Sequence, residues 1–126
     1  MVLLNDFFTI QSVTSDEGRL SAGIRLNAAH PIFAGHFPGN PVVPGVCMVQ
    51  IVKEIMHHFY KKEFTMQTAS QLKFLAILNP NEVPEPDVEI IVLKQEEEGL
   101  HVSGSFSKGT LVFMKFKGVF VSRPLP

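Results

Sequence analysis

One stretch of the sequence combines a histidine, a backbone that cannot be regular and the start of a long apolar run. Four prolines and three glycines fall between His30 and Gly45, so this backbone is neither regular helix nor strand and its amides need other partners. An imidazole such as that of His36 titrates near neutral pH, which suits reversible proton transfer. Backbone N–H groups at a helix start suit a developing negative charge. The stretch therefore has the parts to move a proton beside an oxygen that gains charge.

The apolar run after this loop is predicted to be a helix over about Pro44–Tyr60. Proline is best tolerated in the first turn of a helix, which places the helix start at Pro44-Gly45. The first half, through residues 46–49, is apolar on every side and is expected to be buried all round. The second half turns polar from Lys53 onward, and we expect it to be a solvated end.

Gln50 falls at the junction of these two halves. At 100° per residue it shares a side with Val46, Cys47 and Glu54. Its amide is therefore expected to point into a mostly apolar pocket, where it needs hydrogen-bond partners.

Alternating or compact apolar residues predict strands before and after the helix. The predicted strands are 7–13, 20–26, 66–77, 88–93, 100–107 and 111–121, with a surface crossing at 79–86. A helix that is apolar on all sides needs more cover than a flat sheet gives. We therefore predict an α+β fold in which a curved antiparallel sheet of about five or six strands wraps one long central helix.

Length and composition limit the class of protein. The 126 residues predict a single domain spanning 1–126, and a hydrophobic content of 45% with eleven phenylalanines indicates an additional buried surface, as in an oligomer. The net charge of -1 excludes global attraction to nucleic acid or anionic lipid. The single Cys47 rules out an internal disulfide. The first residues lack signal-peptide features and no apolar run reaches the ~20 residues of a membrane helix, so we expect a cytoplasmic protein.

Residues 35–46, Gly-His-Phe-Pro-Gly-Asn-Pro-Val-Val-Pro-Gly-Val, closely resemble the signature of the 3-hydroxyacyl-acyl carrier protein dehydratases of fatty acid synthesis, which have the hot-dog fold. The match is continuous over the whole signature. Outside it, the likeness is one of length and element order. The resemblance implies the same arrangement that the pattern of strands and helix predicts independently.

The resemblance also implies roles for individual residues. His36 occupies the position of the base that takes the α-proton, and Gly45 that of the amide donor to the thioester carbonyl. The family has an acid fourteen residues after the histidine, where this chain has Gln50, and a primary amide cannot transfer a proton at any useful pH. Glu54, about 6 Å further along the helix, is a stand-in only if the pocket is rearranged. The expected substrate-binding residues are Phe37, Pro38, Pro44, Val46, Cys47 and Glu54.

The expected function is dehydration of 3-hydroxyacyl thioesters on acyl carrier protein to 2-enoyl thioesters, weak or dependent on a partner, in fatty acid or related acyl-chain synthesis. Two alternatives stay open: a non-catalytic acyl-thioester-binding or heterodimer partner subunit, and a hot-dog thioesterase. The family implies a homodimer or an oligomer of dimers, and a heterodimer with an acid-bearing relative would supply the missing acid. Carrier protein and coenzyme A are both open as thioester carriers, and chain length is unreadable.

No cofactor and no metal is expected. His57 and His58 point about 100° apart on a helix, and neither they nor His30 belong to a known ligand set. Candidates for a basic rim facing an acidic carrier protein are Lys61, Lys62, Lys115 and Lys117.

Overall fold

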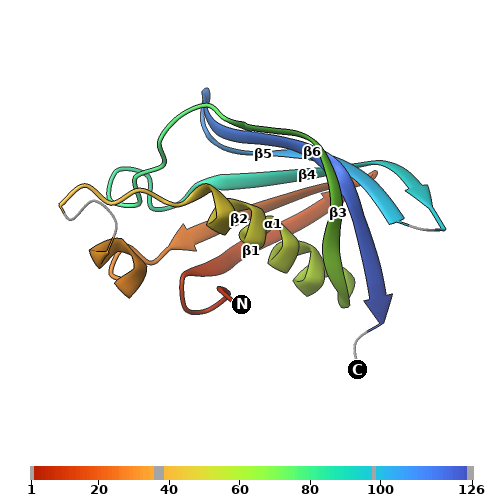
Figure 1. The fold of residues 1–126 in the computed structure, drawn as a ribbon, viewed down its shortest axis with the longest axis horizontal. Coiled ribbons are helices and arrows are strands. Elements are labelled where there is room, and N and C mark those ends of the chain that lie inside the picture. Colours follow the sequence, from red (N-terminus) through yellow and green to blue (C-terminus); the bar gives the residue numbers. More distant parts are fainter. Residues whose placement is uncertain (1, 36–38, 98, 125–126) are drawn as a thin grey trace.

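A computed structural model describes residues 2–35, 39–97 and 99–124 of the chain. Within these residues it contains one α-helix, one short 3-10 helix and six strands (Figure 1). The helices are η1 (Pro31–Ala34) and α1 (Gly45–Tyr60). The strands are β1 (Phe8–Asp16), β2 (Arg19–Leu26), β3 (Lys62–Phe74), β4 (Asp87–Glu96), β5 (Gly99–Lys108) and β6 (Leu111–Pro124). The predicted α+β class, with five or six strands around one long helix, is confirmed.

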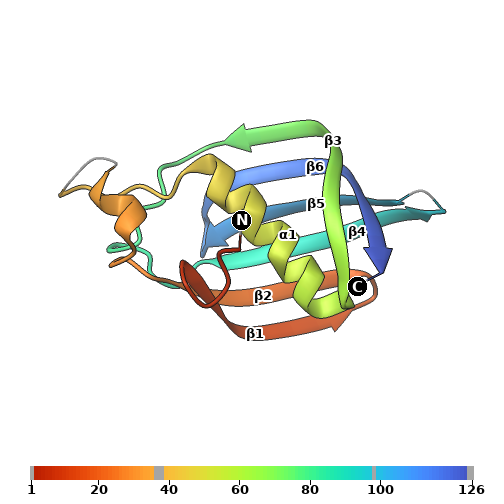
Figure 2. The same cartoon turned by 60° about the horizontal axis from the view of Figure 1, so that its bottom comes forward.

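The six strands form one antiparallel sheet in the order β1-β2-β4-β5-β6-β3. β3 follows α1 in the chain but crosses to the edge of the sheet, where it pairs with β6. Figure 2 shows α1 lying across the concave face of the sheet, with β3 curling round one side of it. A curved sheet of this kind covers the helix on more sides than a flat sheet would.

The core lies between α1 and the concave face of the sheet. Alternate residues of β2 are buried there, as its period-two pattern predicts. The buried side chains of β2 are Leu20, Ala22, Ile24 and Leu26, those of α1 include Met48, Ile51, Val52, Ile55 and Met56, and five phenylalanines, Phe7, Phe8, Phe106, Phe113 and Phe120, are almost completely buried. Burying one large apolar side chain stabilises the fold by about 1.5–3 kcal/mol relative to exposure. This packing fixes the direction of α1 and the position of its first turn.

Two sequence-based expectations about the helix and the next strand are wrong in part. The first half of α1 is not buried all round, because the side chain of Val46 is 69% exposed. α1 ends at Tyr60, as predicted, because Lys61 is the C-cap in a left-handed conformation (φ 57°) and its N–H bonds to the carbonyl of His57. This cap ends the helix and turns the chain directly into β3. β3 therefore spans 62–74 rather than 66–77.

The long axis of the molecule has two distinct ends (Figure 1). η1 and the start of α1 lie at one of them, which we call the loop end. The tip of the β4–β5 hairpin projects at the other, which we call the hairpin end. Within the described residues, no helix is both long and apolar enough to span a bilayer.

Candidate functional site

The start of α1 is set by the two residues that precede it. Pro44 is the N-cap, with extended backbone angles, and its carbonyl oxygen accepts hydrogen bonds from the amides of Cys47 and Met48 at 3.0 and 3.2 Å. Before it, the N–H of Val43 donates to the carbonyl of Leu78 at 2.9 Å, which ties this extended segment to the crossing after β3. A proline cap offers no side-chain acceptor to the amides of the first turn. Their N–H groups and the helix dipole make this end attractive to negative charge.

Gly45, the first residue of α1, lies against the ring of Phe74 at the end of β3. A Cβ built on Gly45 would be 2.5 Å from the Phe74 Cζ, so any side chain there would push the ring aside. The ring is 51% exposed and therefore has room to move. The absence of a side chain at position 45 leaves the space that the Phe74 ring occupies at the start of α1.

Glu54 and Gln50 meet one turn apart on α1. The Gln50 Nε2 donates to the Glu54 Oε2 at 2.8 Å. Glu54 is the one buried charged residue within the described part of the chain, with 9% of its surface exposed. An ionised carboxylate only accepts hydrogen bonds, so this contact turns the amide nitrogen of Gln50 toward Glu54.

The remaining partners of Glu54 come from the N-terminal segment, residues Leu3–Phe7. The amide of Leu3 donates to both carboxylate oxygens at 2.9 Å, and the amide of Leu4 donates to Oε1 at 2.8 Å. A buried carboxylate is tolerated when several donors replace its hydration. Glu54, which the sequence suggested as a stand-in for the missing acid, is therefore already hydrogen-bonded to three donor groups.

His30 holds the base of the loop. Its Nδ1 accepts from the amide of Ile32 at 3.1 Å, as an N-cap of η1, and its Nε2 lies 3.0 Å from the Asp6 Oδ2. Because Nδ1 is an acceptor, the ring proton is on Nε2 and is donated to Asp6. The sequence raised the possibility that His30 is a metal ligand, but it contains no ligand set that includes this residue. In the structure, His30 lies in a hydrogen-bonded turn.

The sequence-predicted site residues lie in three places. Pro44 and Gly45 lie at the start of α1, and Gln50 and Glu54 lie in contact with each other further along it. Cys47 is buried in the core, where burial raises the pKa of its thiol and makes it a poor nucleophile. Val46 lies in the first turn of α1 with its side chain exposed. His36, Phe37 and Pro38 are outside the described residues, so their roles stay predictions.

A pocket of about 390 Å³ opens beside Gln50. It is bounded by the N-terminal segment, one side of α1, the beginning of β3 and the end of β6. Its lining residues are Val2, Leu4, Gln50, Lys53, Glu54, His57, Glu63, Phe64, Thr65 and Arg123. Arg123 and Glu63 form an ion pair across its rim. The pocket places the Gln50 amide beside both apolar and charged side chains.

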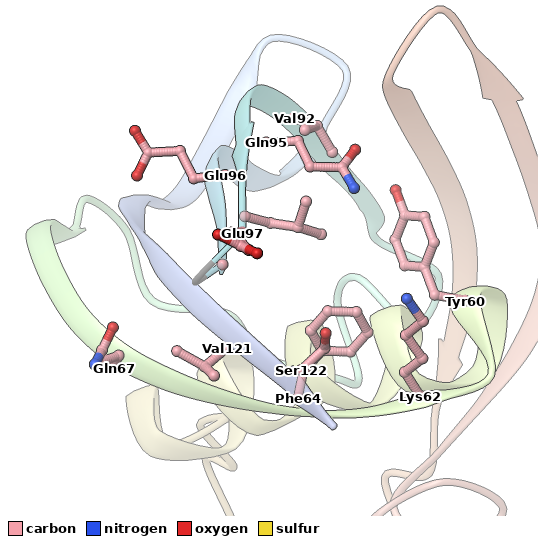
Figure 3. Close-up of a pocket in the computed structure, with 12 residues that line it drawn as sticks. Tyr60, Lys62, Phe64, Gln67, Val92, Gln95, Glu96, Glu97, Val121 and Ser122 are labelled. Atoms are coloured by element: carbon pink, nitrogen blue, oxygen red, sulfur yellow. The ribbon is translucent and has the colours of Figure 1, made fainter. Parts of the chain in front are cut away.

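A larger cavity, of about 790 Å³, lies at the hairpin end (Figure 3). It is bounded by the end of α1, the start of β3 and the β4–β5 hairpin, and its polar lining includes Tyr60, Lys62, Gln95, Glu96 and Glu97. Burial raises the pKa of Tyr60, so this phenol stays neutral over the physiological range. The cavity shares only Phe64 with the pocket beside Gln50.

The described residues contain no cluster of three or more histidine, cysteine, aspartate or glutamate side chains arranged to hold a metal ion. The contribution of the N-terminal segment to the site was not predicted from the sequence. Its one local signal is the Asn5-Asp6 pair, since asparagine tolerates the left-handed conformation that Asn5 adopts (φ 69°). Nothing in the sequence links this turn to Glu54.

Sequence comparisons relate most of the chain to one group of enzymes. The sequence model of the ApeI-like family, described as ApeI dehydratase, matches residues 12–110. The 3-hydroxyacyl-acyl-carrier-protein dehydratase FabZ of Caldicellulosiruptor saccharolyticus is 33% identical over 87 residues, which are 63% of this chain and 62% of that protein. FabZ of Caulobacter vibrioides is 30% identical over 89 residues, 71% of this chain and 52% of the relative. The chain thus covers less than two thirds of the length of these relatives.

Structure comparisons identify the fold. The ApeI:P dehydratase heterocomplex from Xenorhabdus doucetiae has a chain that matches with a TM-score of 0.66 and 16% identity, over 89% of this chain and 96% of that one. A conserved protein from Pseudomonas aeruginosa matches with a TM-score of 0.63 and 14% identity, over 89% and 87%. The six-stranded antiparallel sheet around one helix is the hot-dog fold of these neighbours.

Proposed function

Because the chain belongs to the ApeI-like dehydratase family, we propose that it dehydrates 3-hydroxyacyl thioesters to 2-enoyl thioesters. The observation that carries the proposal is the coincidence of the dehydratase-like signature with a proline-capped helix start that bears Gly45. Acyl carrier protein and coenzyme A are the two carriers to test.

The proposed chemistry is an elimination across two adjacent carbons. The His36 imidazole takes a proton from C2 of the substrate, and the electron pair of that C–H bond forms the C2–C3 double bond. The C3–O bond breaks, and the hydroxyl leaves as water after it gains a proton. The Gly45 amide donates to the thioester oxygen as negative charge develops there, a contribution of about 3 kcal/mol by analogy with single oxyanion donors.

The departing hydroxyl is the weak point of this scheme. Gln50 hydrogen-bonds and orients, but its amide has no proton to transfer. The leaving oxygen therefore receives its proton from the imidazolium of His36 or from an acid on a partner chain. The first route gives slow turnover by the chain alone, and the second gives turnover only in a pair.

A second candidate function is that of a partner subunit that keeps the pocket without turnover of its own. The observation that favours it is the amide at position 50, where an acid is expected. A hot-dog neighbour is itself described as a heterocomplex, ApeI:P. In this case the chain binds the thioester, or shapes the site of an acid-bearing relative, and releases no product when incubated alone.

One assay separates these functions. The purified chain is incubated with a 3-hydroxyacyl group attached to carrier protein or to coenzyme A, and the products are followed by mass spectrometry. A 2-enoyl thioester supports dehydration, and free acid supports the thioesterase alternative. Unchanged substrate that is nevertheless bound supports the partner-subunit function.

We also propose that the chain pairs through the free edge of β3. This edge is the end of the sheet order, and five exposed apolar residues gather beside it and at the start of α1: Val46, Leu72, Phe74, Leu75 and Ile77. Exposed apolar side chains along an unpaired strand are typical of an interface. In sedimentation, Ile77→Asp should shift an assembled wild type toward 14.0 kDa, whereas Leu93→Asp at the hairpin end should not. A wild type that is already a monomer at micromolar concentration would contradict homodimerisation.

A further inference from the structure

The N-terminal segment is a compact turn that touches both halves of the candidate site. The amides of Asp6 and Phe7 donate to the carbonyl of Leu3 at 3.1 and 2.7 Å, and the amide of Asn5 donates to the carbonyl of Phe8 at 2.7 Å. Figure 2 shows the segment crossing in front of α1 before it enters β1. Because its own backbone bonds close the turn, a displacement at one side of it is passed to the other.

One side of the segment is attached to α1 through Glu54. The three contacts from Leu3 and Leu4 are charge-assisted and largely withdrawn from water. Such bonds are about twice as strong as neutral ones. The same carboxylate receives the Gln50 amide, so the segment and the Gln50 side chain share one anchor.

The other side of the segment is attached to the base of the loop. Asp6 accepts from His30, which in turn caps η1 through Ile32. The ring of Phe7 is fully buried, and its centroid lies 5.3 Å from that of His30 and 5.4 Å from that of Phe33. η1 ends at Ala34, immediately before the signature residues.

We propose that the N-terminal segment is a clasp that fixes η1 and Gln50 relative to each other, with Glu54 and His30 as its two positioning residues. The proposal rests on the proposed function only in assigning catalysis to the groups that the clasp holds. Misplacement of a catalytic group by about 1 Å can cost about 100-fold in rate. The clasp therefore acts on turnover without contacting the reacting atoms.

The first test is amide hydrogen exchange of the full chain, resolved by residue, in Glu54→Gln. An amide side chain offers one acceptor oxygen where the carboxylate offers two, and its NH2 group opposes the donors from Leu3, Leu4 and Gln50. Exchange should accelerate about tenfold at Leu3 and Leu4, and also at Ile32 and Phe33 at the base of the loop. The control Glu89→Gln removes a carboxylate from a surface pair with Arg19 and should leave all four amides unchanged.

The second test uses an exposed residue, Asp6, whose variant is expected to fold even if Glu54→Gln does not. The Asp6 side chain is 71% exposed, so Asp6→Ala removes the bond to His30 with little loss of packing. It should also accelerate exchange at Ile32. His30→Ala should act in the same way, whereas His30→Asn should restore protection at Ile32, because asparagine is a good N-cap.

The third test is kinetic, and it applies if the wild type dehydrates a 3-hydroxyacyl thioester. Glu54→Gln and Asp6→Ala should each lower kcat at least about tenfold with KM changed less than about twofold, since the clasp sets geometry rather than binding. The double variant should lose less than the product of the single losses, because both break one unit.

Two results would overturn the clasp. One is faster exchange at Leu3 and Leu4 in Glu54→Gln with Ile32 and Phe33 unchanged, which would make the two attachments independent. The other is an active wild type whose kcat is insensitive to both variants. An inactive wild type would defeat the proposed function alone, and the exchange measurements would still decide whether the clasp exists.

Discussion

The loop end and the hairpin end of the molecule differ in what their polar groups have available for chemistry. The hairpin end has the larger cavity, 790 Å³ against 390 Å³. Its Glu96 is hydrogen-bonded to Lys94, and this contact lowers the pKa of Glu96 and raises that of Lys94. Both groups are thereby held in their charged forms and are not suited to proton transfer at neutral pH. The loop end carries the start of α1 with the Gly45 amide, and the smaller pocket lies further along α1, beside the Gln50 amide. Chemistry, rather than volume, distinguishes the two ends.

The largest expected effect on activity comes from removing the proposed base, His36. His36→Ala should lower dehydration by about 10²- to 10⁴-fold, the usual contribution of a positioned acid or base. The circular dichroism spectrum should be unchanged. His58→Ala, on an exposed part of α1, is the matched control and should keep full activity. Activity that survives in His36→Ala would assign proton removal to another group.

The next effect concerns the amide at the helix start. Gly45→Pro should lower kcat by about 10²- to 10³-fold, since it removes one oxyanion donor, while proline remains acceptable at the first helical position. Gly45→Ala keeps the N–H and only displaces the half-exposed Phe74 ring, so it should lose far less. Equal losses in the two variants would mean that the Phe74 contact matters and the N–H does not.

Gln50→Glu tests the amide that replaces an acid. The new carboxyl would lie where the Gln50 Nε2 now donates to Glu54 at 2.8 Å, and two carboxylates this close cannot both ionise. The pair therefore shares one proton, which gives position 50 a group that can transfer a proton. Dehydration should rise at least about 100-fold.

Gln95→Glu, in the larger cavity, is the matched control for this gain and should not change the rate. A folded Gln50→Glu variant with no gain would mean that the pocket beside Gln50 serves another task. A wild type as fast as acid-bearing relatives would show that no acid is needed at position 50.

The smallest effect belongs to the hairpin end. Because burial raises the pKa of Tyr60 in the folded state, the unfolded chain loses this proton first as pH rises. Stability contributed by the neutral phenol is therefore complete below about pH 10 and is lost above it. Tyr60→Phe should flatten this alkaline loss in urea titrations and leave dehydration unchanged. A large fall in activity would make the hairpin end part of the site.

The arrangement of strands and helix was predictable because its signals are local. The alternation in β2 and the Pro44-Gly45 helix start each lie within a few residues of sequence. The bounds of β3 were not predictable, because this edge strand is exposed along most of its length and shows no regular alternation. An edge strand buries too little to carry a period-two pattern.

The engagement of Glu54 was hidden from the sequence for a different reason. Its partners Leu3 and Leu4 are about 50 residues away and bind it through backbone amides, which every residue type except proline has. His30 was similarly inconspicuous, since helix caps are usually sought among serine, threonine, aspartate and asparagine. Local patterns therefore predicted the fold and the signature, whereas the support of the site depends on contacts between distant segments.

The position of β3 beside β6 has a kinetic consequence for folding. β3 pairs with β6 over separations that run from Phe74 with Met114 to Lys62 with Pro124, so this pairing closes a long stretch of chain. Non-local pairing of this kind slows folding toward the millisecond-to-second range. During synthesis, at about 5–20 residues per second, β3 waits several seconds for its partner strand to emerge. The nascent chain therefore has an interval in which an unpaired strand edge and part of the apolar surface of α1 are exposed to aggregation.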